Sequence, residues 1–213
     1  MNLQKIAMGL GLSIALVACS KDEETIVVPV SAITVKDLAA DTVTGLGLDG
    51  RPQSALTTTY YSLVDNKAIA STDAASTKWD IAFSSTKILI NGGTSGPGIG
   101  GAFVHIGSFD TFTSIPADSI FKTDNANAAS YAIPLGSGKA WYTYDGLTTL
   151  VSPIAGRVLV IRTATGKYAK IEILNYYKGG VTLASTASVN DKLFKQRYYT
   201  FRYTYQSNGS KVF

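Results

Sequence analysis

The chain has 213 residues, of which 46% are hydrophobic and 16% charged, and its formal net charge at pH 7 is +4. This length suits one domain, and the hydrophobic content is sufficient for a packed core. The charges form no basic stripe of the kind that neutralises phosphates, which argues against nucleic-acid binding.

The N-terminus has the layout of a secretory signal. Lys5 precedes an apolar run over residues 6–17. A helix of twelve residues spans roughly 18 Å, whereas the hydrocarbon core of a bilayer is about 30 Å thick. We therefore expect a signal peptide over residues 1–18 and no transmembrane helix there.

The only cysteine, Cys19, ends the sequence LVAC at residues 16–19, which resembles a bacterial lipobox. In a lipobox the cysteine is lipidated and becomes the first residue of the mature protein. Residues 20–24 (SKDEE) resemble the signal that sends some Gram-negative lipoproteins to the outer face of the outer membrane. We expect lipidation at Cys19 and a tether over 19–30; the alternatives are a free core cysteine and an ordinary solvated charge run.

Residues 31–213 read as one all-β domain of many short antiparallel strands, because the chain is rich in tyrosine, threonine, valine and isoleucine and has 20 glycines for turns. Helical patterns are limited to 35–40 and 189–195, and no repeat of 20–50 residues is present. The strand candidates, in chain order, are 56–64, 67–70, 79–90, 102–109, 140–144, 157–162, 167–177 and 198–205.

The segment 167–177 shows the clearest alternation. Ala169, Ile171 and Ile173 share one face of the expected strand, while Lys170 and Glu172 share the other. This pattern predicts one buried and one wet face.

Common catalytic motifs are missing from the sequence. His105 is the only histidine, and both methionines lie in the expected signal peptide, so a zinc motif with two histidines cannot form. The glycines at 96–101 match a dinucleotide-binding pattern but precede a strand pattern rather than a helix. We expect no enzyme; a glycosidase with two carboxylates stays open, although no pair of acids stands out among the 15.

Three segments together resemble one family. They are residues 78–83 (KWDIAF), 153–177 (PIAGRVLVIRTATGKYAKIEILNYY) and 198–205 (YYTFRYTY). They resemble HmuY, a family of surface haem-binding lipoproteins, and the resemblance covers most of residues 30–206. It implies an all-β fold, a lipid anchor at the cell surface, haem captured between strands and loops, and transfer of the haem to a TonB-dependent outer-membrane receptor.

The resemblance also implies where haem would bind. In the best-known member two histidines hold the iron, and one of them precedes the Pro-x-x-Gly that opens the second segment; Thr149 takes that place here. Haem iron accepts histidine, cysteine thiolate, methionine or tyrosine. The candidates for haem binding are therefore His105, Tyr142, Tyr144 and the position of Thr149, although His105 also fits a packed strand histidine and both tyrosines also fit packing residues.

Three hypotheses follow. The first is a surface lipoprotein that captures haem with non-standard or absent axial ligation. The second is a member of the family that has lost haem and binds another ligand or a partner protein, and the third is the glycosidase. A homodimer through an exposed β edge or an aromatic face is compatible with each of them.

Overall fold

The computed structural model describes residues 30–127 and 130–213. The expected signal peptide, Cys19 and all of the tether except Val30 lie outside these residues, so the anchor stays a prediction. In the described part of the chain, no helix is long and apolar enough to cross a membrane.

The described residues form an antiparallel β domain with one short α-helix, as the sequence predicted. The elements in chain order are β1 (Ile33–Ala39), β2 (Val43–Leu46), β3 (Pro52–Ser54), β4 (Thr59–Ser62), β5 (Lys67–Ile69), η1 (Ser71–Asp73), β6 (Ile81–Ser84), β7 (Lys87–Ile90), β8 (Gly101–Ile106), β9 (Tyr142–Asp145), β10 (Leu150–Pro153), β11 (Arg157–Arg162), β12 (Tyr168–Tyr177), η3 (Lys178–Gly180), α1 (Val189–Phe194) and β13 (Gln196–Gln206).

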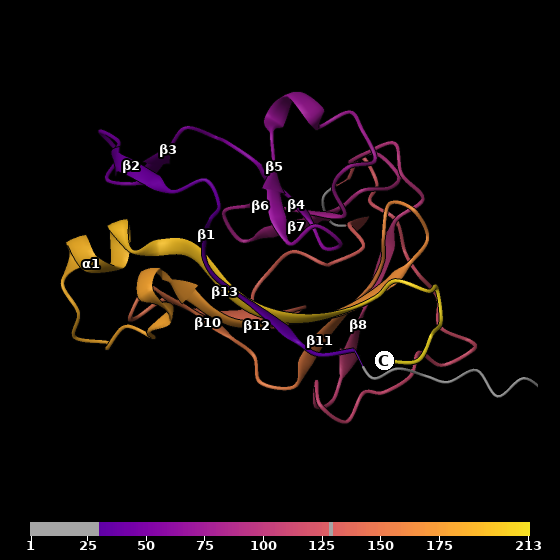
Figure 1. Cartoon of the computed structure of the whole chain (residues 1–213). Helices are drawn as coiled ribbons and strands as arrows, with labels where there is room; N and C mark the ends of the chain where they lie inside the picture. Colours follow the sequence, from indigo (N-terminus) through magenta and orange to yellow (C-terminus); the bar gives the residue numbers. More distant parts are fainter. Residues whose placement is uncertain (1–29, 128–129) are drawn as a thin grey trace, which may run out of the picture.

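Two sheets and two separate hairpins make up the domain (Figure 1). The larger sheet has the order β1-β13-β12-β11-β8, and the smaller has the order β5-β4-β6-β7. The hairpins are β2–β3 and β9–β10. In Figure 1 both hairpins and α1 lie at one end of the larger sheet, while β8 lies at the other.

The main core lies between the two sheets and is rich in aromatic rings. Phe83 of β6 contacts Tyr199 and Phe201 of β13, with ring centroids 4.7 and 5.5 Å apart. Trp141 adds to this cluster at a centroid distance of 5.2 Å from Tyr199. Large buried rings contribute strongly to folding, and Trp141 also fixes the start of β9 on the core.

The opposite face of the larger sheet is covered by a loop. Phe109, Phe112 and Ile115 of this loop pack on Val158 and Val160 of β11 in a second apolar cluster. Both clusters consist of residues after Val30, so a chain that begins at residue 20 contains the whole described fold.

This loop overturns the prediction of a wet face at Lys170. The side chain is buried, and Nζ donates to the carbonyl oxygens of Phe109 and Phe112, both at 2.8 Å. Removal from water lowers the pKa of Lys170. The strand alternation was correct, but it carries no information on which distant segment covers the second face.

Other predicted elements need correction as well. The segment 79–90 is not one strand but a hairpin of β6 and β7, which turns at Ser85 with φ 53°. Residues 35–39 belong to β1 rather than to a helix. The helix expected near 189–195 is confirmed as α1, where the Ser188 side chain accepts a hydrogen bond from the backbone N–H of Asp191.

Candidate ligand-binding groove

A cavity of about 480 Å³ opens between the two hairpins, α1 and the start of β13. We call it the hairpin groove. Its size falls within the usual range for small-molecule sites. The apolar residues that line it are Leu46, Pro52, Tyr144, Leu147, Val189 and Leu193. The remaining lining residues are Gly50, Thr148, Thr149, Lys192 and Gln196.

Apolar side chains in this groove are unusually open to solvent. Leu147 is 97% exposed, Val189 73% and Tyr144 50%. Single exposed leucines are common on protein surfaces, but several around one cavity mark a binding site. The groove therefore offers apolar surface that a ligand would cover.

One cation accompanies this apolar surface. Lys192 is the only charged side chain among the described residues that line the groove. Its Nζ donates to the carbonyl oxygen of Ser185 at 2.7 Å, and the Asp145 carboxylate of the β9–β10 turn is close enough to Lys192 to interact with its charge. An apolar cavity with one cation and no carboxylate fits a ligand that combines an apolar body with an anionic group.

The β9–β10 hairpin presents its tip to the groove through a turn held by Asp145. The Asp145 carboxylate accepts hydrogen bonds from the Leu147 N–H at 2.9 Å and the Thr148 hydroxyl at 2.6 Å. The bond from Thr148 is the main reason that the pKa of Asp145 lies below its ordinary value. The turn then passes through Thr149 at φ 58°, a strained conformation for a β-branched residue.

The β2–β3 hairpin is tied to the start of β13 by a buried ion pair. The Asp41 carboxylate accepts from the Ser54 hydroxyl at 2.8 Å and from Arg197 Nη1 at 3.3 Å. Arg197 follows Gln196 of the groove and itself has φ 67°. This pair holds two walls of the groove together at their base.

The third wall, α1, is short and relies on local contacts. An ion pair of 2.8 Å joins Lys195 to Asp191 one turn earlier, and Leu193 is the buried residue that points inward. The helix also contacts β2. The three walls thus come from segments about 95 and 40 residues apart in the chain, which only the fold brings together.

Two of the four predicted haem-binding positions lie in this groove. Tyr144 and Thr149 both line it. Tyr142 is buried below it, with its ring 4.7 Å from that of Trp141. The assignment of these residues to a haem site stays a prediction.

His105 lies elsewhere in the fold. It pairs with Val158 of β11, which belongs to the second apolar cluster, and its ring lies 4.4 Å from that of Phe112. Cross-strand partners share a face of the sheet, so His105 belongs to the face that the loop covers. In Figure 1, β8 is also on the far side of the molecule from α1.

Sequence reasoning missed Leu46, Leu147, Val189 and Lys192. One local signal was available, because Leu147 follows Asp145 and Gly146 in a turn where a polar residue is usual. The other three carry no such signal, since an apolar residue in a strand or helix and a lysine on a helix are both ordinary.

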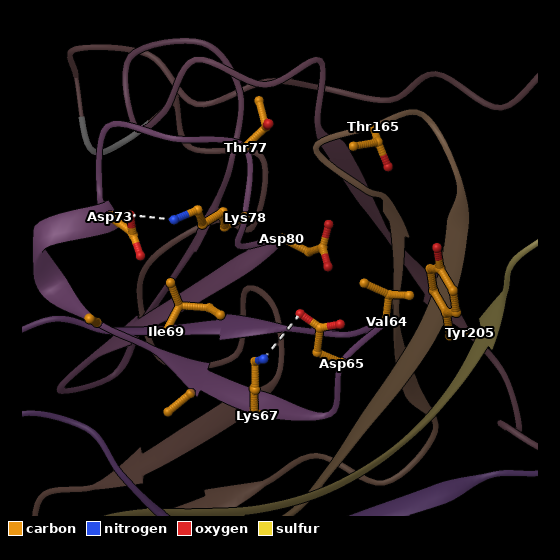
Figure 2. A pocket seen from close by; sticks show the side chains of 12 residues that line it. Val64, Asp65, Lys67, Ile69, Asp73, Thr77, Lys78, Asp80, Thr165 and Tyr205 are labelled. Carbon is orange, nitrogen blue, oxygen red and sulfur yellow. Dashed lines mark hydrogen bonds and ion pairs between the residues drawn. The ribbon is translucent and has the colours of Figure 1, made fainter.

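A second cavity of about 480 Å³ lies beside β5 and is lined by both charged and apolar residues (Figure 2). Its acids are already engaged: Asp65 lies 3.7 Å from Lys67, and Asp73 lies 2.8 Å from Lys78. Figure 2 shows both ion pairs as dashed lines. In this view Asp80 lies between the two pairs on one side and Tyr205 on the other.

Asp80 is the buried acid of this second cavity. Its carboxylate accepts from the backbone N–H groups of Leu63 at 2.9 Å and Ala164 at 3.1 Å. Burial raises the pKa of Asp80, and the charge of Asp65 adds to this effect. Asp80 therefore joins two loops, while the other two acids of the cavity, Asp65 and Asp73, each pair with a lysine.

A built-in metal centre is also not evident in the described ranges 30–127 and 130–213, where no three His, Cys, Asp or Glu side chains cluster. Among the residues that the structure describes, no histidine, cysteine, methionine or acid lines the groove.

Comparison with known proteins gives one family. The model of the family described as HmuY protein matches residues 55–188. No curated protein matches the chain.

Several solved structures have a similar fold. One is described as a candidate lipoprotein from Bacteroides fragilis; it is 17% identical, with a TM-score of 0.48 over 81% of this chain and 87% of that chain. The apo HmuY analog of Tannerella forsythia is 15% identical, with a TM-score of 0.38 over 84% and 96%. A candidate HmuY-like haem-binding protein of Bacteroides vulgatus is 11% identical, with a TM-score of 0.43 over 81% and 90%.

Proposed function

This chain is a member of the HmuY family, and we propose that it captures haem or a related tetrapyrrole in the hairpin groove. The observation that carries the proposal is the groove itself, with its exposed Leu147 and Val189 and its single cation, Lys192. Haem combines a large apolar ring with carboxylates, and this lining complements both parts. The role is binding, and we propose no catalytic one.

The described residues of the groove offer the iron at most one axial ligand. Of the side chains that haem iron accepts, only the Tyr144 phenol lines it. The Thr149 hydroxyl is not a usual ligand, and His105 lies on the loop-covered face of β8. The proposed haem site therefore has either a tyrosine ligand or no axial ligand from the protein.

The cellular part of the proposal rests on the sequence and the family. We propose that residues 1–18 are removed, that Cys19 is lipidated, and that the tether 19–30 holds the domain 31–213 on the outer face of the outer membrane. From there the ligand would pass to a TonB-dependent receptor. A homodimer through an exposed edge of the larger sheet, formed by β1 or β8, is a further expectation.

A haemin titration of the chain from residue 20 tests this function. We expect a saturable shift of the Soret band at one haemin per chain. Flat difference spectra with both ferric and ferrous iron would end the haem proposal. The alternative hypothesis would then apply, in which the same groove binds another apolar anion or a partner protein. The scarcity of iron ligands in the groove favours this alternative.

A pair of variants locates the site. Val189→Asp places a carboxylate in the groove, where it repels an anionic ligand and opposes burial of the ring, so we expect haemin binding to be lost. Ile120→Asp is the matched control, because Ile120 is 77% exposed and is not among the residues that line the groove. Equal binding by both variants would place the site elsewhere.

A further inference from the structure

We infer that the hairpin groove recognises the organic ring and its carboxylates rather than the iron, so that metal-free protoporphyrin IX binds as tightly as haemin. This inference rests on the proposed function, and it goes further by assigning the ligand class as tetrapyrroles irrespective of their metal.

The described residues of the groove offer few donors to an iron atom. Tyr144 is its only side chain of a type that binds haem iron, and a tyrosine ligates ferric iron after losing its phenol proton. Among the described residues, the Tyr144 hydroxyl has no hydrogen-bond partner, whereas its backbone N–H donates to the Ser137 hydroxyl at 2.8 Å. No neighbouring base is in place to accept the phenol proton.

The other candidate donors do not reach the groove. Tyr142 is buried, and its ring lies 4.7 Å from that of Trp141 in the core. His105 packs on Phe112 under the loop of the second cluster. An iron at the groove would therefore keep water or a solvent anion as its axial ligands.

The groove offers a ligand mainly apolar surface and one cation. Leu147, Val189 and Leu46 offer apolar surface, and burial of such surface is non-directional and indifferent to the atom at the centre of the ring. Lys192 can pair with a carboxylate on the rim. Haemin and protoporphyrin IX share the ring and both propionates, and they differ only in the iron and its axial ligands.

These contacts do not depend on an iron ligand. A site that depended on the metal would keep a strong donor near the ring centre. This site keeps a large apolar lining and one cation instead, which is the combination that a metal-free ring requires.

Parallel titrations of the chain from residue 20 with haemin and with protoporphyrin IX test the inference. We expect the two dissociation constants to agree within about threefold. A factor of ten corresponds to about 1.4 kcal/mol, so the two binding free energies should differ by less than half of that. If haemin binds and protoporphyrin IX binds more than about tenfold more weakly, the inference is wrong while the proposed function stands. If neither binds, both are wrong.

Tyr144→Phe removes the one oxygen that could bind iron and keeps the ring. We expect the affinity and the Soret spectrum of bound haemin to stay the same. A loss of affinity confined to haemin, with a changed spectrum, would identify Tyr144 as an iron ligand and overturn the inference.

Lys192→Gln tests the carboxylate contact. Both ligands should weaken equally, by up to about fivefold, as for one partly exposed ion pair. Lys195→Gln is the matched control on the same helix, since Lys195 pairs with Asp191 and does not line the groove. A selective effect of Lys192→Gln on haemin would contradict a metal-independent site.

Discussion

Replacement of Leu147 by alanine separates ligand binding from folding. The side chain is 97% exposed at the tip of the β9–β10 hairpin, so it contributes little to the stability of the free protein. A ring bound in the groove would cover it. Truncation removes three carbons at about 0.8 kcal/mol for each buried CH₂, and with partial coverage the loss is about 1 to 2 kcal/mol. The dissociation constant for haemin should therefore rise about fivefold to thirtyfold.

The assay pairs a haemin titration with thermal unfolding of the same samples. The melting temperature of Leu147→Ala should change by less than about 2 °C, because surface substitutions usually lie within about 0.5 kcal/mol. Ile120→Ala is the control, with similar exposure outside the groove lining. An unchanged dissociation constant for Leu147→Ala would refute the reasoning that the hairpin tip covers the ligand. An equal loss in Ile120→Ala would show that the effect is not local.

Three further predictions concern the scaffold around the groove and the second cavity. Thr149→Gly relieves the strain of a positive φ, so we expect the melting temperature of this variant to stay within about 2 °C of that of the unchanged protein. Thr143→Gly in strand β9 should lower the melting temperature by several degrees. Equal losses in the two variants would contradict strain at Thr149. Asp80→Asn should cost about 1 to 3 kcal/mol in urea unfolding, because an amide oxygen replaces only one of two carboxylate acceptors for backbone N–H groups, and an unchanged midpoint would contradict these bonds. The hydrogen bond from Thr148 lowers the pKa of Asp145, so the ionised Asp145 stabilises the fold above its unfolded pKa, and this stabilisation is lost as the pH falls through the folded pKa. Thr148→Val should therefore raise the Asp145 pKa in an NMR titration. An unshifted titration would rule that bond out as the cause.

The sequence was sufficient for the fold class and for the central hairpin. The β11–β12 pair follows from alternating apolar residues around the turn at Gly166, where φ 83° suits glycine. The break between β6 and β7 could not be seen in the same way. Its turn uses Ser85 at φ 53° within a largely apolar run that has no glycine or proline. Tertiary contacts impose that turn, and local propensity gives little warning of it.

The candidate site was only partly predictable for a different reason. The family motif led to Thr149 and its neighbour Tyr144 because both are close to a recognisable stretch of chain. Leu46 and Lys192 belong to segments without such a motif, and they join the groove only after the β2–β3 hairpin and α1 have folded against it. Periodicity reports the face of an element, whereas a groove depends on which distant elements lie beside it.

The path of β1 relates the groove to the proposed anchor. The described chain enters the larger sheet at Ile33, and β1 runs for seven residues to Ala39, six steps of about 3.3 Å or about 20 Å at most. Two residues later Asp41 binds Arg197 at the base of the groove. Figure 1 shows the same separation, with the start of β1 toward the middle of the larger sheet and the two hairpins and α1 at its far end. The proposed tether would join the domain next to β1, so we expect the groove to lie at the other end of β1, open to a ligand and to the proposed receptor.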